Sequence, residues 1–182
     1  MPDPDESWFD GALRRAQDGQ PSGFDELVRH LDARLVGFAR ARGADDPEGL
    51  ADEVLVQMCR SIREFEGNLP QLRAWVFTIA RNRIIDERRW AARRLDAVPT
   101  EPSRLPDATT DAHISDAEQR ERVDALLAGL TDDQREIVVL RVVVGLSVDE
   151  TASIVGRRAG AVRALQHRAL RSLRSQLVRE GE

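Results

Sequence analysis

The stretch from Leu72 to Arg94, LRAWVFTIARNRIIDERRWAARR, constrains the fold of this chain more than any other segment. Its first half is apolar at positions i, i+3, i+4 and i+7, the spacing of one buried helix face. These positions are Leu72, Trp75, Val76 and Ile79. The run is also basic, since residues 73–94 carry seven arginines against two acids. We therefore expect a helix that packs into a domain at one end and offers a basic surface at the other.

The apolar stripe of this helix does not continue straight. It should return at position 83, which is Arg, and the next apolar pair is Ile84 and Ile85. The buried face is therefore predicted to rotate, or the helix to kink, around residues 80–83, turning Arg81, Asn82 and Arg83 outward. Arginine forks and an amide that reads a base edge are typical of nucleic-acid contacts. A surface helix with a solvated basic face would give the same pattern.

A second stretch, from Thr131 to Arg174, favours nucleic acid. Capping boxes predict two helix starts, Thr131 with Gln134 and Ser147 with Glu150. The first of these helices is predicted to end at Gly145 and the second at Gly156. A third helix is predicted to begin near residue 160. A short helix, a tight turn and a longer basic helix form the helix-turn-helix pattern, whose second helix enters the DNA major groove.

The last of these helices separates an apolar stripe from a basic face. The stripe predicted to be buried is Val162, Leu165, Ala169, Leu173 and Leu177. The basic residues that lie off it are Arg163, His167, Arg168, Arg171 and Arg174. This separation is expected of a recognition helix packed on its domain.

The first third of the chain also predicts helices. A short helix is expected over residues 10–18, and a longer one that starts at a capping box of Ser22 with Asp25 and runs to about residue 40. Asp46 followed by Pro47 is an N-cap with proline at the first helical position, so a third helix should run from there to about residue 63. Residues 66–71, EGNLPQ, are predicted to form a loop.

The middle of the chain separates two helical domains. Three prolines and small polar residues follow position 94 without an apolar period, which predicts a flexible or extended linker. A capping box of Ser115 with Glu118 is expected to begin the second domain. Its first helix should turn four apolar residues inward, namely Val123, Leu126, Leu127 and Leu130.

The net charge of −5 hides an uneven distribution. Basic residues outnumber acidic ones in residues 73–94 and again in residues 134–182, where nine arginines face five acids. Confined basic character of this kind is typical of a nucleic-acid footprint. The acidic remainder is expected to weaken DNA binding by the free protein.

Other classes of function find little support. The single cysteine, Cys59, excludes an internal disulfide and is expected to fill core, and no Cys/His cluster offers a metal site. His30, His113 and His167 lack a nucleophile or acid–base partner set, so no catalytic residue and no cofactor is predicted. No apolar run is long enough to cross a membrane, and the start lacks signal-peptide features, so a cytoplasmic protein without membrane insertion is expected.

The two motifs together resemble the extracytoplasmic-function (ECF, group IV) sigma factors of the sigma-70 family. RAWVFTIARN, residues 73–82, is similar to region 2.3–2.4 of that family. LSVDETASIVG, residues 146–156, and GAVRALQHRAL, residues 160–170, are similar to region 4.2. Shorter similarities are ALRRAQDG, FDELV and LADEV, which begin at residues 12, 24 and 50. The resemblance spans nearly the whole chain apart from the first ten residues or so and the linker.

The resemblance implies an all-α fold of two small domains joined by a flexible linker. Sigma region 2 would occupy residues 11–95 and sigma region 4, with the helix-turn-helix, residues 116–178. Residues 1–10, 96–115 and 179–182 would be an extension, the linker and a tail. The implied function is that of an alternative sigma factor, which binds core RNA polymerase and directs promoter-specific initiation by recognising and melting the −10 element and reading the −35 element.

The resemblance also implies partners and site residues. The partners are the beta-prime clamp and beta flap of core RNA polymerase, promoter DNA and an anti-sigma factor. The expected −10 contacts are Asn68, Arg81, Asn82, Arg83, Arg88 and Arg89. The expected −35 contacts are Arg158, Arg163, His167, Arg168, Arg171 and Arg174. The expected core polymerase contacts are Asp52, Glu53 and Gln57.

The chain departs from the family pattern at two positions, and two other functions remain compatible with the sequence. Gly49 stands where the family usually carries Asp, and Arg158 where it commonly carries Pro. A free-standing helix-turn-helix regulator would share the second motif, and an adaptor protein without a DNA role would share the helical fold. Co-purification with core polymerase would separate a sigma factor from both.

Overall fold

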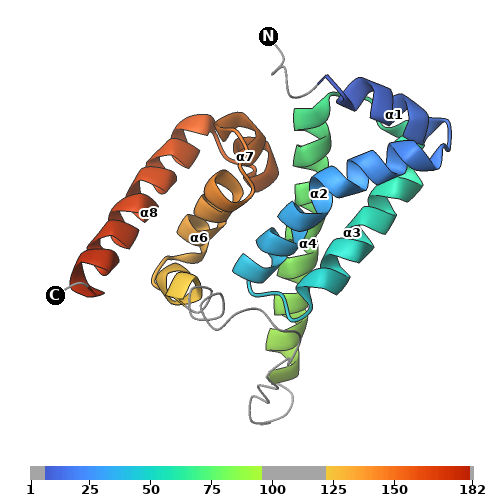
Figure 1. The fold of residues 1–182 in the computed structure, drawn as a ribbon. Coiled ribbons are helices and arrows are strands. Elements are labelled where there is room, and N and C mark those ends of the chain that lie inside the picture. The colour runs from blue at the N-terminus through green and yellow to red at the C-terminus, as the bar shows by residue number, and fades with distance from the viewer. Residues whose placement is uncertain (1–6, 96–121, 181–182) are drawn as a thin grey trace.

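The structure is a computed structural model that describes residues 7–95 and 122–180. Within these ranges every regular element is helical, which confirms the all-α prediction (Figure 1). The first domain contains α1 (Phe9–Gln17), α2 (Pro21–Ala41), α3 (Pro47–Ser61), the 3-10 turn η2 (Ile62–Glu64) and α4 (Leu69–Leu95). The second contains helical residues 122–128, α6 (Asp132–Val138), η3 (Val139–Val143), α7 (Val148–Val155) and α8 (Ala159–Glu180). The predicted linker, residues 96–115, and the Ser115–Glu118 capping box lie outside the described residues.

The core of the first domain forms around the N-terminal half of α4. In Figure 1 the helices α1 and α3 lie to one side of α4, and α2 crosses it. Phe77 of α4 is fully buried and meets Phe38 of α2 edge to face, with ring centroids 5.5 Å apart. Such a pair adds geometric preference to the burial of two large apolar side chains. The helix that carries the basic run is thus fixed by the domain core.

Of the two alternatives predicted for α4, a rotated buried face or a kink, the structure shows the rotation, because the helix is continuous over Leu69–Leu95. Its buried positions advance mostly in steps of four: Leu69, Leu72, Val76, Ala80 and Ile84. Since four residues turn a helix by about 40° beyond a full circle, the buried face rotates gradually along a helix without a break. Trp75 and Ile79 are therefore only half-buried, and α4 also begins inside the segment predicted to be a loop.

The start of α2 also differs from the prediction. The helix begins at Pro21 after Gln20, whose side chain makes no capping hydrogen bond, so the Ser22–Asp25 capping box was wrong. Proline at N1 presets the helical φ angle and lacks the N–H that would otherwise need a partner. The start of α2 is also pressed against α1, since a Cβ on Gly23 would lie 2.3 Å from the Ala16 nitrogen. By contrast, Asp46 caps α3 as predicted, accepting from the Gly49 nitrogen at 2.9 Å.

The second domain follows its predicted capping residues closely. Thr131 with Gln134 and Ser147 with Glu150 form complete capping boxes at the starts of α6 and α7. Gly156 ends α7 in the left-handed conformation, at φ 65°, a conformation that glycine adopts without steric cost. Two apolar predictions were wrong, because Val123 is 47% and Leu177 46% exposed. Each lies near an end of its helix, where fewer neighbouring elements are available to cover it.

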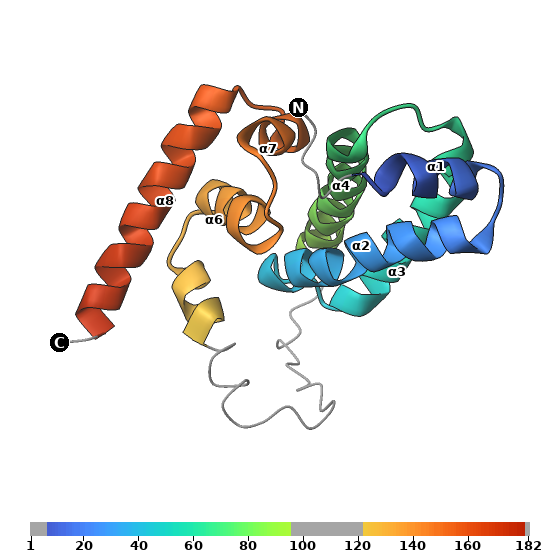
Figure 2. The same ribbon diagram turned by 45° about the horizontal axis from the view of Figure 1, so that its top comes forward.

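The two domains pack against each other (Figure 2). The helix α4 contacts α7, and α2 contacts η3. The buried apolar cluster is continuous across this junction, joining Leu35 and Phe38 of α2 to Leu140 and Val144 of the second domain. The approach is close at Gly37, where an added Cβ would lie 3.5 Å from Val143 Cγ1. The described residues therefore form one closed unit.

Candidate nucleic-acid interface

The helix α8 presents its predicted −35 residues to the outside. Val162, Leu165 and Ala169 are buried against the rest of the domain, in agreement with the predicted stripe. The basic residues off that stripe are all exposed, namely Arg163, His167, Arg168, Arg171 and Arg174. An exposed basic face on a helix anchored by its opposite face has the geometry of a helix that inserts into a DNA groove.

The turn before α8 sets the direction of this basic face. Ile137 of α6 packs with Val162 and Leu165, so α6 supports the first turns of α8. The left-handed Gly156 lets the chain reverse after α7. Arg158 is exposed just before α8, and its carbonyl accepts from the Ala161 nitrogen at 2.9 Å. The three elements α6, α7 and α8 thus make the predicted helix-turn-helix unit.

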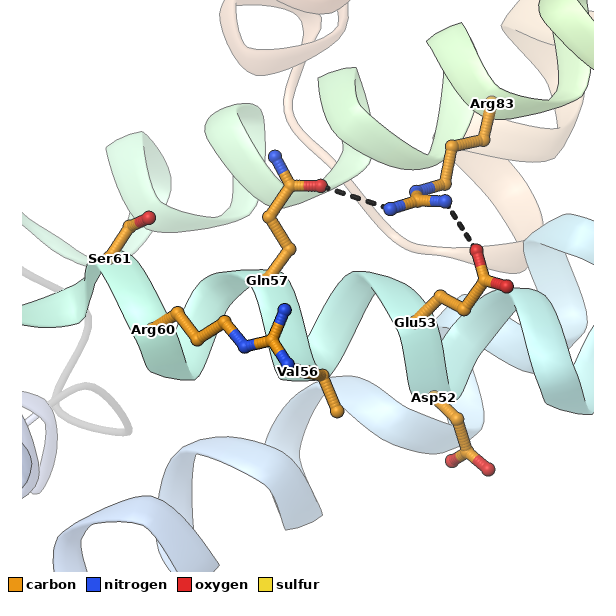
Figure 3. A pocket seen from close by; sticks show the side chains of 7 residues that line it. All are labelled: Asp52, Glu53, Val56, Gln57, Arg60, Ser61 and Arg83. Atoms are coloured by element: carbon orange, nitrogen blue, oxygen red, sulfur yellow. Dashed lines mark hydrogen bonds and ion pairs between the residues drawn. The ribbon is translucent and has the colours of Figure 1, made fainter.

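The predicted DNA contacts on α4 are less exposed than those on α8, and Arg83 is an example. Its guanidinium donates to Glu53 and, over 3.2 Å, to Gln57 Oε1, both on α3 (Figure 3). Arg83 therefore faces its own domain, whereas the sequence predicted that it turns outward. It lies in a pocket of about 520 Å³ with Asp52 and Arg60 among the lining residues. The structure thus brings one predicted −10 residue together with the predicted polymerase contacts, of which Asp52 points away from Arg83 (Figure 3).

Two more predicted −10 residues face the second domain. Arg81 Nε lies 3.0 Å from Glu136 Oε1, and Arg88 lies 3.6 Å from Asp132. Both acids belong to α6. The remaining basic residue, Arg89, is exposed and lies 3.6 Å from Asp86.

Asn82 is exposed on the same part of α4, as predicted. Trp90, further along, is 56% exposed. An exposed amide and an exposed aromatic ring are groups that can hydrogen-bond to or stack on unpaired bases. This exposed part of α4 has the chemistry of a single-strand contact.

Asn68 has a structural role that the sequence analysis missed. It caps α4: Asn68 Oδ1 accepts from the Gln71 nitrogen at 3.0 Å, and Gln71 Oε1 accepts from the Asn68 nitrogen at 2.9 Å. The signal was present as Asn followed three residues later by Gln, the spacing of a capping box. The cap uses Oδ1 of Asn68 and leaves its amide nitrogen able to donate to a base.

Phe65, in the loop before α4, forms a stacked aromatic pair with Trp75 of α4. The rings of Phe65 and Trp75 lie 5.5 Å apart and are inclined by only 16°. They line a pocket of about 280 Å³ together with Ser61, Glu64 and Glu66. Trp75 was predicted to be a core residue, but it packs at the edge of the core, because the buried face of α4 has rotated toward Val76 and Phe77.

A buried ionic cluster, Arg42 with Glu136, was also missed. Arg42 is 4% and Glu136 6% exposed, and their charged groups lie 3.5 Å apart. Burial lowers the pKa of Arg42, and the Glu136 carboxylate opposes that shift. The sequence carried a weak signal, since Arg42 occupies the next position of the buried stripe Leu31–Leu35–Phe38. A charge on a buried stripe implies a partner, but the sequence could not say that the partner lies in the other domain.

These features define a class: an all-helical, two-domain DNA-binding protein in which a helix-turn-helix accompanies a second basic helix with single-strand chemistry. The family models agree with this division. "Sigma-70 region 2" matches residues 27–94, and "Sigma-70, region 4" matches residues 120–173.

Curated relatives extend the match over the chain. It is 35% identical to the ECF RNA polymerase sigma factor SigD of Mycobacterium tuberculosis, over 96% of this chain and 86% of that protein. It is 33% identical to the ECF RNA polymerase sigma factor ShbA of Streptomyces griseus, over 94% of this chain and 96% of that protein. The chain belongs to the ECF sigma factors of the sigma-70 family.

Solved structures share the fold. CnrH, solved with the cytosolic domain of CnrY, aligns with a TM-score of 0.68 at 24% identity, over 91% of this chain and 94% of CnrH. The sigma factor RpoE of Bartonella quintana, solved with the anti-sigma factor NepR, aligns with a TM-score of 0.63 at 28% identity, over 84% of this chain and 94% of RpoE.

Family membership settles the class of function. The chain is an ECF sigma factor that directs RNA polymerase in promoter-specific transcription initiation, and it is not an enzyme. The alternatives of a free-standing regulator and of an adaptor without a DNA role are set aside. Across residues 7–95 and 122–180 no helix combines the length and the apolar character needed to cross a membrane.

Proposed function

We propose that the chain divides promoter recognition between α4, which contacts the −10 element, and α8, which contacts the −35 element. Residues 11–95 would form the −10 and polymerase-binding domain, and residues 116–178 the −35 domain. The observation that carries the proposal is the helix-turn-helix arrangement of α7 and α8, with a basic face exposed opposite a buried apolar stripe.

On α8 we propose two kinds of contact. Arg163 lies near the start of the helix, the part of a recognition helix that meets base edges. It and Arg168 are proposed to bond to guanine through both nitrogens of the guanidinium fork. Arg171 and Arg174 lie a turn or more further on and are proposed to bind phosphates, while Arg158 and His167 contribute positive or polar contacts at the groove edge.

On α4 we propose that Asn82 reads a base of the −10 element once the strands have separated. Its amide is exposed and can donate to and accept from a base edge. Arg81, Arg83, Arg88 and Arg89 are proposed to hold the backbone. Asn68 lies just before the helix, where its amide nitrogen is proposed to add a second base contact.

The contact with core polymerase is proposed to lie on the outer face of α3, through Asp52, Glu53 and Gln57, which are exposed. The departure at Gly49 has a local explanation. A Cβ on Gly49 would lie 2.2 Å from Asp46 Oδ2, the carboxylate that caps α3. Gly49 therefore leaves room for the Asp46 carboxylate in its capping position, and the three other side chains would provide the contact with polymerase.

Partners and location follow from the same assignment. We propose binding to the beta-prime clamp through the first domain and to the beta flap through the second, in the cytoplasm where the polymerase works. An anti-sigma factor is proposed as the inhibitor, because the related RpoE of Bartonella quintana was crystallised with the anti-sigma factor NepR. No cofactor is proposed.

The test is reconstitution with core RNA polymerase and a library of promoter fragments from the native genome. The protein is expected to pull the polymerase to a discrete subset of promoters and to start transcripts there. Silence across the whole library, with a known sigma factor active in the same assay, would contradict the proposal.

A further inference from the structure

We infer that Gln17, the last residue of α1, is a positioning residue for base reading in the −10 element. Its side chain holds the segment that leads from η2 to Asn68, and so it fixes where Asn68 meets a base. The inference rests on the proposed −10 contact of Asn68. It gives α1, which makes none of the proposed DNA or polymerase contacts, a part in promoter specificity.

Gln17 is hydrogen-bonded to the main chain of the turn that precedes α4. Gln17 Nε2 donates to the Phe65 carbonyl at 2.8 Å and to the Ile62 carbonyl at 3.3 Å. One primary amide carries two N–H groups, so a single side chain can supply both bonds. The Ile62 carbonyl also accepts from the Phe65 nitrogen at 3.1 Å, which closes η2. Gln17 therefore ties both ends of this turn to a helix that is 45 and 48 residues away in the sequence.

The helix α1 is itself held firmly by α2. Arg15 Nη2 lies 2.7 and 2.8 Å from the two carboxylate oxygens of Glu26. Ala16 is fully buried, and an added Cβ on Gly23 would lie 2.3 Å from its nitrogen. Because close-packed elements of this kind cannot shift without losing contacts, Gln17 extends from a fixed position.

The segment that Gln17 holds leads directly to the proposed base contact. Gln17 binds the main chain of Phe65, while the ring of Phe65 stacks on Trp75 with centroids 5.5 Å apart. Phe65 is thus held through both its carbonyl and its ring, and only two residues separate it from Asn68. A side chain that reads a base has to be held within about 0.5 Å of its productive position. Loss of the Gln17 bonds should therefore displace Asn68 relative to the base.

Three substitutions separate the donated bonds from simple packing. Gln17→Met keeps the length of the side chain but removes both N–H groups, which leaves two carbonyls without this donor. Gln17→Lys keeps a donor at similar reach and should rescue the tether. Gln20→Met is the matched control, because Gln20 is exposed in the next turn and its side chain makes no capping hydrogen bond.

The first experiment measures the tether without DNA. Trp8→Phe with Trp90→Phe leaves Trp75 as the only tryptophan of the full chain, so that its fluorescence reports the stacked pair. In this background Gln17→Met is expected to raise the acrylamide quenching constant of Trp75 about twofold, because the turn opens locally. Gln17→Lys and Gln20→Met should quench like the parent. Equal quenching in Gln17→Met would overturn the inference.

The second experiment measures initiation by polymerase reconstituted with each variant, on promoters that carry every single −10 and −35 substitution. Gln17→Met is expected to lower base preference about fivefold at one −10 position, the low end of what a good base contact provides. That position should be the one altered by Asn68→Ser, and the double variant should lose no more than either single variant, since both act on one contact. Gln17→Lys and Gln20→Met should keep the wild-type preference.

These outcomes separate the inference from the proposed function. A wild-type protein without −10 preference, or an Asn68→Ser variant with wild-type preference, would reject the proposed contact of Asn68. With that contact intact, unchanged preference in Gln17→Met would reject only the positioning role. An equal loss in Gln17→Lys, or a uniform loss at all −10 and −35 positions, would also overturn it, because packing or general stability would then explain the effect.

Discussion

The two basic helices of this chain carry similar arginine side chains, but these are exposed on α8 and largely paired with carboxylates on α4. On α8 the five basic residues off the buried stripe are exposed. On α4 three of the predicted contacts are engaged by carboxylates, Arg81 by Glu136, Arg83 by Glu53 and Arg88 by Asp132. The helix α8 lies at the edge of the molecule, whereas α4 lies between its own domain and the other one (Figure 1).

The difference shows that the number of arginines on a helix does not measure the positive charge available to DNA. An ion pair with a carboxylate neutralises the group, and burial of that pair raises the cost of exchanging it for a phosphate. We therefore expect the free protein to offer its −35 helix to DNA more readily than its −10 helix. Substitutions on each helix can test this contrast.

The largest expected difference between the two helices is the effect of a side-chain truncation on the free energy of unfolding. Phe77→Ala on α4 removes a fully buried ring packed on Phe38 and should lower the free energy of unfolding by about 3–5 kcal/mol. Leu177→Ala on α8 removes a side chain that is 46% exposed and should change it by less than about 0.5 kcal/mol. Urea unfolding measures both, and similar losses would contradict the central position of α4.

The buried charge at the domain junction gives the next largest effect. Arg42→Gln leaves Glu136 in a buried site with one guanidinium fewer and should cost about 3 kcal/mol. The matched control is Arg40→Gln, which removes a surface pair with Glu48 and should cost under about 0.5 kcal/mol. Thermal unfolding of both variants decides whether the junction contributes to stability, and an unchanged midpoint for Arg42→Gln would argue against it.

The cap of α4 offers a smaller and sharper test. Asn68→Ala removes the side-chain acceptor and should cost about 1 kcal/mol, whereas Asn68→Ser keeps a capping oxygen and should cost only a few tenths. If Asn68 also reads a base, the Ser variant should alter preference at one −10 position despite its near-normal stability. A Ser variant with wild-type preference in initiation assays would restrict Asn68 to capping.

The smallest expected effect concerns Glu87 on the basic half of α4. Glu87 is exposed, but partial desolvation raises the pKa of its carboxyl group above the ordinary value of 4.5, and the charges of Asp45 and Glu53 raise it further. A raised folded pKa means that ionised Glu87 costs stability above that pKa, and that the cost vanishes below 4.5. Glu87→Gln should therefore raise Tm by about 1–2 °C at pH 7 and leave it unchanged at pH 4. A gain that persists at pH 4 would exclude ionisation as the cause.

The sequence predicted the second domain better than the first. The capping boxes at Thr131 and Ser147 and the glycine stop at Gly156 are local signals, and local hydrogen bonds decide those helix boundaries. The Ser22 capping box failed because close packing of α1 on α2 at Gly23 and the proline at N1 set the start instead. Local chemistry alone could not reveal that packing.

The sequence predicted which types of residue form the site, but it predicted only some of their exposures correctly. Asn82 and the basic face of α8 are exposed as expected. The direction of Arg81 and Arg83 depends on acids 55 and 30 residues away in the sequence. Periodicity along one helix carries no information on such distant partners, which is why the predicted outward turn of Arg83 was wrong.

The most direct test of the account is initiation by polymerase reconstituted with three variants, assayed on promoters that carry single substitutions in the −10 and −35 elements. Asn82→Ala is expected to alter base preference only within the −10 element, and Arg163→Ala only at one −35 position, costing about 1–3 kcal/mol there. Arg174→Ala should weaken all promoters alike and lower the salt dependence of binding by about one unit. Uniform losses for all three variants would contradict the division of reading between α4 and α8.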